Sequence, residues 1–247
     1  MPRPVLIFDF DGTVAVGDGP LLAYARAVAA HAASADAFVA RVAAHLASPT
    51  PDVIDGYDAV RRLAEAEAIP ADALSTAYRA SRAHLGTADA PIATAAGLVA
   101  FLEEVDAERL LVTNAPATRL DEALAGLGLA GLFDRVVTDA AKPVGLELLL
   151  DTLGAGTRVL AIGDVWRNDL APAHARGHAT ALVAAYPDPA AHPTFRADTL
   201  DELLPTLADW VAAAGDDRSP RAATARPLAP ALPASRVDAP PAKTLST

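Results

Sequence analysis

Short apolar runs alternate with amphipathic stretches over much of the chain. Residues 4–9 form an apolar run with β-branched side chains that ends in acidic residues and Gly12. This pattern predicts a buried strand that runs into a turn. Comparable runs at 109–113, 135–138 and 158–162 predict three further strands, and residues 180–183 predict a fifth. Because helical stretches separate these strands, we expect βαβ units and a parallel sheet.

Apolar residues at helical spacing fill the intervals between the later strands. One helix is predicted around Leu98–Val105, and a second from Leu120 to a stop signal at Gly128. Thr199 and Glu202 have the spacing of a capping box ahead of a leucine-rich stripe. Pro205 falls inside that third helix, so we expect a kink there or a later start.

Residues 15–92 do not continue the strand–helix alternation. They contain no convincing strand pattern and indicate alanine-rich helices at roughly 20–33, 36–47, 53–68 and 72–85. Simple alternation would place a second strand soon after the first. We therefore predict a helical domain, residues 15–92, inserted into a core domain formed by residues 1–14 and 93–214.

The composition changes again near Gly215. Residues 215–247 are rich in Pro, Ala and Ser and have no hydrophobic periodicity. Such a segment cannot bury enough apolar surface to offset the entropy lost on folding. We interpret it as a disordered, solvated tail rather than a binding motif.

The bulk composition narrows the class of protein. The chain has 247 residues, 52% of them hydrophobic, which suits one α/β domain with a large core or a core with a smaller insert. Its net charge of −11 disfavours nucleic acid and anionic membranes as partners. A phosphate-bearing ligand would therefore need a local cation or helix N-termini.

The absence of cysteine and the nature of the N-terminal residues bear on where in the cell the protein is expected. The chain contains no cysteine, which excludes disulfides and thiolate zinc sites. The first residues, MPRPVLIFDFDG, reach acidic side chains before a long apolar run develops, which is unlike a signal peptide. We expect a soluble, cytoplasmic protein.

The sequence Asp9-Phe10-Asp11-Gly12-Thr13 at the end of the first strand is the sharpest chemical signal. In open α/β sheets, sites form at the carboxyl ends of the strands. Two carboxylates there suit a hard cation such as Mg²⁺, and they allow one to attack while the other handles protons. An Asp-x-Asp motif alone also occurs in calcium loops and turns, so the apolar strand before it matters.

Two weaker candidates follow the next two strands. Thr113 and Asn114 precede a helix predicted near Pro116, where a hydroxyl and backbone N–H groups could hold an anion. They could equally be a helix cap. Lys142, which precedes Pro143, could meet negative charge, or it could be an ordinary solvated lysine.

The fourth strand leads into Gly163-Asp164-Val165-Trp166-Arg167-Asn168-Asp169. Asp164 is placed at the carboxyl end of that strand and Asp169 at the start of the next helix. Asp169 alone could be a cap or a first-turn acid that interacts with the helix dipole. Together, the two carboxylates favour a metal site.

These four motifs, FDFDGT, VTN, KP and GDVWRND, resemble in their order those of the haloacid dehalogenase (HAD) superfamily. The resemblance covers residues 1–14 and about 93–212. It implies a Rossmann-like three-layer α/β core with a parallel sheet, and the helical insertion resembles the mobile cap of the family. The residues after Lys142-Pro143 are Val-Gly, where many relatives have a second proline.

The resemblance also implies roles for the motif residues. Asp9 would be the nucleophile, and Asp11 would protonate the leaving group and then activate water. Thr113 and the backbone N–H of Asn114 would hold phosphoryl oxygens, while Lys142 would neutralise charge. Mg²⁺ would bind Asp9, the Asp11 carbonyl and Asp164. Asp169 would support the metal shell, through water or by orienting Lys142.

The resemblance further suggests a small phosphorylated metabolite as substrate, such as a sugar phosphate, a nucleotide or a phosphoglycolate-like acid. Dehalogenases of the superfamily lack the second aspartate, so Asp11 favours phosphatase or phosphomutase chemistry. Two other interpretations remain open. A phosphorelay receiver domain also places acids, a hydroxyl and a lysine at strand ends, and a catalytically silent binding module would keep the same fold.

Other side chains of the predicted insertion are weaker candidates. The six histidines of the chain fall outside the four motifs. Four arginines could reach a substrate, although we expect most of them to form a solvated face: Arg61, Arg62, Arg79 and Arg82. Trp166 is expected to pack beside the site or to touch the substrate.

Overall fold

The computed structural model describes residues 3–48, 53–185 and 188–213. These described residues belong to one compact unit. The predicted disordered tail, residues 215–247, lies outside the described residues.

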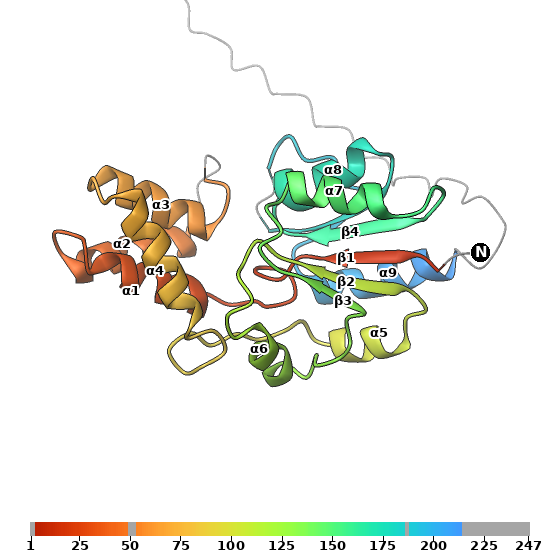
Figure 1. Ribbon diagram of the computed structural model, residues 1–247, viewed down its shortest axis with the longest axis horizontal. Helices are drawn as coiled ribbons and strands as arrows, with labels where there is room; N and C mark the ends of the chain where they lie inside the picture. Colours follow the sequence, from red (N-terminus) through yellow and green to blue (C-terminus); the bar gives the residue numbers. More distant parts are fainter. Residues whose placement is uncertain (1–2, 49–52, 186–187, 214–247) are drawn as a thin grey trace, which may run out of the picture. The chain divides into compact units, whose positions relative to one another are not determined.

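A six-stranded parallel sheet forms the centre of the core (Figure 1). Its order is β3-β2-β1-β4-β5-β6. The strands are β1 (Val5–Phe8), β2 (Glu108–Val112), β3 (Arg135–Val137), β4 (Val159–Gly163), β5 (Ala179–Val183) and β6 (Phe195–Ala197). All neighbouring pairs are parallel, so the predicted Rossmann-like α/β fold is confirmed.

The register places the ends of the central strands at one edge. Phe8 at the end of β1 lies opposite Leu111 of β2 and Ile162 of β4. The strand β1 is buried along its whole length, and the backbone N–H of Asp9 still donates to the Ile162 carbonyl at 2.9 Å. Residues that follow β1, β2 and β4 therefore leave the sheet at the same edge, where sites form in open α/β folds.

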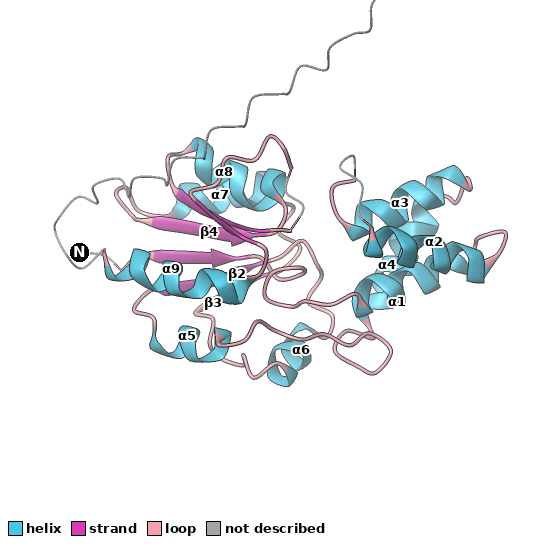
Figure 2. Cartoon of the chain, turned by 180° about the vertical axis from the view of Figure 1, so that it is seen from behind, coloured by secondary structure: helices cyan, strands magenta, loops and turns pink. Residues whose placement is uncertain are grey.

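Helices cover both faces of the sheet (Figure 2). Leu6 and Phe8 of β1 belong to the apolar core beneath α5, α6 and α9, whereas Val5 and Ile7 belong to the core beneath α7 and α8. This division follows from the alternation of side chains along a strand. The helices are α5 (Leu98–Glu104), α6 (Leu120–Gly126), α7 (Val144–Thr152), α8 (Ala171–Ala175) and α9 (Leu200–Ala212), with a π-helical turn, η1 (Trp166–Leu170), before α8.

Four helices lie between β1 and α5, close to the positions that the sequence predicts. They are α1 (Gly19–Ala29), α2 (Ala35–Ala47), α3 (Gly56–Ala66) and α4 (Ala71–Arg82), and we call them the inserted helices. They share an apolar cluster of their own, which includes Tyr24, Phe38 and Val60. Val16 and Ala93 exchange backbone hydrogen bonds of 2.9 and 3.0 Å, so the chain leaves and re-enters the core side by side. Their standing as a separate cap domain remains a prediction.

The structure corrects several local predictions. The short strand β6 was missed because its three residues, with Arg196 in the middle, form no apolar run. The helix expected near Pro116 begins at Leu120. Thr199 stands at the N-cap of α9 but makes no side-chain cap, and Glu202 accepts from the N–H of Asp198 instead, at 3.3 Å.

Pro205 does not delay the start of α9, which runs through it from Leu200. Within the part of the chain that the structure describes, no helix is both long enough and apolar enough to cross a lipid bilayer.

Candidate active site

The motif residues meet at the carboxyl edge of the sheet. Asp9 follows β1, Thr113 follows β2 and Asp164 follows β4, whereas Lys142 lies on the loop between β3 and α7. They line a cavity of about 800 Å³. The same cavity is lined by the other three predicted site residues: Asp11, Asn114 and Asp169. All seven residues predicted as catalytic, phosphate-binding or metal-binding therefore border one space.

Three carboxylates form its most acidic corner. One oxygen each from Asp9, Asp164 and Asp169 lies within 4.8 Å of the others. Burial raises the pKa of Asp9 to about 7, and repulsion from Asp169 adds to this rise. Burial also raises the pKa of Asp164 well above its ordinary value, with a further contribution from Asp9. The group is thus short of positive charge.

Glycines allow this close approach. A methyl group added at Gly12, which has a φ of +87°, would lie 2.2 Å from Asp164 Oδ2. One added at Gly163 would lie 2.4 Å from Asp169 Cβ. Only a residue without a Cβ fits at either position, so the backbone packs directly against Asp164 at Gly12 and against Asp169 at Gly163.

Lys142 supplies a fixed positive charge beside two of these acids. Its Nζ donates to Asp9 Oδ1 at 2.5 Å and to Asp169 Oδ1 at 2.7 Å. All three side chains are less than 10% exposed. Burial alone would lower the pKa of Lys142, but the two carboxylates raise it above its ordinary value. The interpretation of Lys142 as a solvated lysine is therefore wrong.

Asn114 and Thr113 have structural partners that the sequence did not reveal. Asn114 Oδ1 accepts from the backbone N–H of Lys142 at 2.6 Å, and its Nδ2 donates to the Lys142 carbonyl at 3.4 Å. Thr113 Oγ1 accepts from the N–H of Ala115 at 3.0 Å. Because α6 begins only at Leu120, Thr113 and Asn114 neither cap a helix nor border a helix N-terminus. Asn114 instead holds the loop that carries Lys142.

Asp169 lies within η1 rather than at the first turn of a regular α-helix. Its Oδ2 accepts from the backbone N–H of Val165 at 3.0 Å, while its Oδ1 accepts from Lys142. Turns of this type are frequent at functional sites. Both carboxylate oxygens thus have fixed donors, which orients Asp169 toward Lys142 and Asp9.

Asp11 receives its donors from the inserted helices. Arg82 Nη1 of α4 donates to Asp11 Oδ1 at 2.8 Å, and the Tyr57 hydroxyl of α3 makes a long contact of 3.5 Å with the same oxygen. Arg82 is only 1% exposed and its guanidinium lies 6.0 Å from the Phe10 ring. Its Nε and Nη2 are buried without a hydrogen-bond partner among the described residues. The expectation of a solvated arginine holds for Arg79 but is wrong for Arg82.

The sequence pattern of haloacid dehalogenase-like hydrolases matches residues 4–177. The chain belongs to this family. It is therefore a hydrolase whose matched region contains all four motifs and the inserted helices. No curated protein matches the chain.

Solved structures of other HAD proteins share the fold of this hydrolase. One is a haloacid dehalogenase-like family hydrolase from Xanthomonas campestris, with 19% identity, a TM-score of 0.54 and coverage of 87% of this chain and 95% of that one. A HAD hydrolase from Bacillus subtilis, bound to magnesium, has 19% identity, a TM-score of 0.57 and coverage of 84% and 99%. A predicted phosphoglycolate phosphatase from Haemophilus somnus has 17% identity, a TM-score of 0.57 and coverage of 83% and 98%.

The donor set of this HAD hydrolase fits a divalent cation. Two buried carboxylates, Asp9 and Asp169, and the half-buried Asp164, with oxygens within 4.8 Å of one another, provide the hard ligands that Mg²⁺ prefers. Burial first, and repulsion among the carboxylates second, raise the pKa values of Asp9 and Asp164 in spite of the nearby Lys142. A divalent cation would supply the missing charge.

Trp166 and the arginines of the inserted helices differ in whether they line the cavity. The Trp166 ring lies 5.2 Å from the His174 ring and packs against the core beneath α7 and α8, rather than lining the cavity. Arg61 does line the cavity. One sequence signal separates Arg82 from Arg79, because helical spacing places Arg82 on the same face of α4 as Leu74 and Tyr78.

Proposed function

We propose that this HAD hydrolase is a Mg²⁺-dependent phosphatase that cleaves small phosphate monoesters through a phosphorylated Asp9. The observation that carries the proposal is the arrangement around Asp9, whose carboxylate lies 2.5 Å from a buried lysine and beside two further acids. Attack by a carboxylate on a phosphate dianion brings like charges together, so positive charge must already be in place. Asp9, Asp164 and the Asp11 carbonyl would hold Mg²⁺, which would offset this repulsion.

In the first half of the reaction, an Asp9 carboxylate oxygen forms a bond to phosphorus while the ester P–O bond breaks. The departing alkoxide takes a proton from Asp11 and leaves as an alcohol. Arg82 and Tyr57 both contact Asp11 Oδ1, so Oδ2 is the oxygen that carries this proton. In the second half, Asp11 removes a proton from water, which attacks phosphorus, releases phosphate and restores Asp9.

Thr113 and Lys142 serve the phosphoryl group in this scheme. Thr113 Oγ1 accepts from Ala115, which leaves its own O–H free to donate to a phosphoryl oxygen. Lys142 lies beside Asp9 and meets the charge that moves onto the phosphoryl oxygens. Asn114 keeps the Lys142 loop in register through its two backbone contacts.

Asp11 supports a phosphatase over a dehalogenase, because a halide leaves without a proton. Phosphomutase chemistry uses the same groups, and no feature of the site favours it. The receiver-domain interpretation loses its basis, since the chain belongs to a hydrolase family and its candidate nucleophile follows the first strand.

Metal dependence is the first expected result. An aryl phosphate should be hydrolysed with Mg²⁺ and not with chelator. At about 100 times its Kd, Mg²⁺ should also add about 2.7 kcal/mol to the free energy of unfolding. Asp164→Asn should weaken Mg²⁺ binding by at least about tenfold, because it removes an anionic ligand. Thermal unfolding at increasing Mg²⁺ concentration measures the stabilisation of the wild type and the weaker binding in Asp164→Asn. Asp151→Asn, on the exposed surface of α7, is the matched control.

Equal stabilisation of wild type and Asp164→Asn by Mg²⁺ would place the metal elsewhere. Turnover in excess chelator would remove the metal from the proposed function altogether.

Arg82 should act on turnover rather than on substrate binding. It contacts Asp11 but does not line the cavity. We expect Arg82→Met to lower kcat by about 10- to 100-fold through misplacement of Asp11, with little change in KM. Steady-state kinetics on Arg82→Met and on Arg79→Met, an exposed arginine of the same helix, provide the comparison. A rise in KM at unchanged kcat would contradict a positioning role.

A further inference from the structure

The part of the cavity that lies beyond the phosphoryl site is built mainly by the inserted helices. α1, α3 and α4 contribute a wall of three tyrosines, Tyr24, Tyr57 and Tyr78, together with Leu21 and Leu74. The tyrosine rings contact one another, with centroids 5.6 to 6.0 Å apart. The alcohol part of a phosphate ester bound at Asp9 would therefore lie against aromatic and aliphatic surface.

The charges on this wall are mostly negative. Beyond the motif residues, the described residues that line the cavity include four carboxylates and a single guanidinium: Asp18, Asp55, Asp58, Glu65 and Arg61. Arg82 is behind the wall and is paired with Asp11. An anionic group on the alcohol part would thus meet an excess of like charge.

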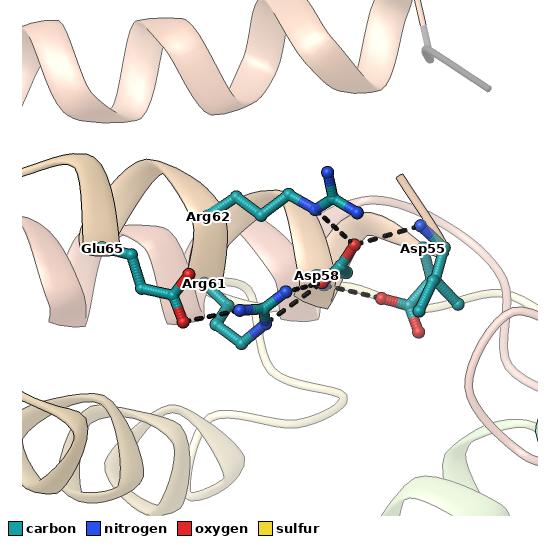
Figure 3. Close-up of polar contacts among 6 residues, drawn as sticks. Asp55, Asp58, Arg61, Arg62 and Glu65 are labelled. Atoms are coloured by element: carbon teal, nitrogen blue, oxygen red, sulfur yellow. Dashed lines mark hydrogen bonds and ion pairs between the residues drawn. The ribbon is translucent and has the colours of Figure 1, made fainter. Parts of the chain in front are cut away.

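The guanidinium that lines this wall, Arg61, already binds two carboxylates (Figure 3). Arg61 donates to Asp58 Oδ1 from Nε at 3.1 Å and from Nη2 at 2.5 Å, and its Nη1 donates to Glu65 at 2.5 Å. The second oxygen of Asp58 accepts from Arg62 Nε at 2.8 Å. An arginine held by two carboxylates of its own helix presents little net positive charge to a ligand.

Asp55 adds a carboxylate that forms no ion pair with any of the described residues. Its Oδ1 accepts from the backbone N–H of Asp58 at 2.7 Å, which caps α3. This partner is neutral, so the negative charge of Asp55 is not cancelled. Asp18 stands at the N-cap position of α1 without a side-chain cap, and it is exposed on the cavity wall.

We infer that the substrates are phosphate monoesters whose alcohol part carries no anionic group and has apolar or aromatic surface. This inference rests on the proposed function. Esters of hydroxy acids, such as phosphoglycolate, are disfavoured because their carboxylate would lose water beside these acids, and Arg61, the cation that the described residues place on this wall, is already held by Asp58 and Glu65. Neutral and basic alcohols avoid this cost, and a basic group could also rest on the tyrosine faces.

Three esters of similar shape and leaving-group basicity test the inference: para-(hydroxyethyl)phenyl, para-(aminoethyl)phenyl and para-(carboxymethyl)phenyl phosphate. With Mg²⁺ at fixed ionic strength, kcat/KM for the neutral and basic esters should exceed that for the acidic one by at least about tenfold. This difference in kcat/KM, which we call the selectivity gap, should become smaller as the salt concentration rises. An acidic ester that is used as well as the neutral one would overturn the inference.

Charge-neutralising variants test whether the acids of the cavity wall cause the discrimination against the acidic ester. Asp55→Asn keeps a side-chain oxygen to cap α3, and Glu65→Gln releases one side of Arg61. Each should narrow the gap between neutral and acidic esters by about threefold or more. Glu104→Gln, on exposed surface of α5, changes the net charge equally and should leave the gap unchanged.

The outcomes separate the two claims. If Glu104→Gln narrows the gap as much as Asp55→Asn and Glu65→Gln do, the selectivity comes from overall charge and the cavity inference is wrong. If none of the three esters is hydrolysed with Mg²⁺, the proposed function fails and the inference falls with it. Hydrolysis without selectivity removes the inference alone.

Discussion

Asp9→Asn should abolish phosphatase turnover, with kcat/KM lower by at least about 10⁴-fold. The amide that replaces the carboxylate is not a nucleophile, so no phosphoryl-enzyme can form. The fold should survive, because asparagine has the same shape and can still accept a hydrogen bond from Lys142 Nζ. Initial rates on an aryl phosphate with Mg²⁺, alongside thermal unfolding of the same samples, measure both expectations.

Asp121→Asn is the matched control for this change. Asp121 lies exposed on α6 and does not line the cavity. It should keep wild-type turnover. A folded Asp9→Asn protein that hydrolyses the aryl phosphate at the wild-type rate would show that another group attacks phosphorus.

Lys142→Met is expected to have the second-largest effect. Methionine keeps much of the length of the lysine but removes the charge that faces Asp9 and Asp169. Without it, the phosphoryl group meets an uncompensated acidic corner, so kcat should fall by roughly 10²- to 10³-fold. The metal-free protein should also lose about 3–5 kcal/mol of stability, because two buried carboxylates lose their partner.

Mg²⁺ should restore part of that stability, since a cation would again offset the repulsion among the carboxylates. Turnover and chemical unfolding with Mg²⁺ and with chelator separate the catalytic loss from the structural one. Arg135→Met, an exposed cation of β3, removes the same charge outside the cavity and should change neither. Wild-type turnover in a folded Lys142→Met protein would exclude Lys142 from the reaction.

The sequence predicted the sheet and the convergence of the motifs because both depend on local signals. Apolar runs mark the parallel strands, and parallel strands end at one edge. Asp9, Thr113 and Asp164 each stand just past such a run, so their meeting follows from the topology. The short β6 has only three residues and no such run, which explains why it was missed.

The contacts made by the inserted helices could not be predicted in the same way. Arg79 and Arg82 belong to the same helix, yet Arg79 is exposed, whereas Arg82 shares the buried face of α4 with Leu74 and pairs with Asp11. The difference depends on which face of α4 packs toward the core, and this is a tertiary property. The role of Asn114 in holding Lys142 likewise depends on the approach of two loops 28 residues apart in sequence.

The most direct test of the account is to look for the phosphorylated Asp9 itself. Asp11→Asn should still allow attack on an aryl phosphate with a good leaving group, but it removes the base that activates water, so the intermediate should accumulate. Acid quenching during turnover, followed by peptide mass spectrometry, should find one phosphoryl group on the peptide that contains Asp9, and mild base should remove it. Turnover with an unmodified Asp9, or a phosphoryl group on another residue, would contradict the account.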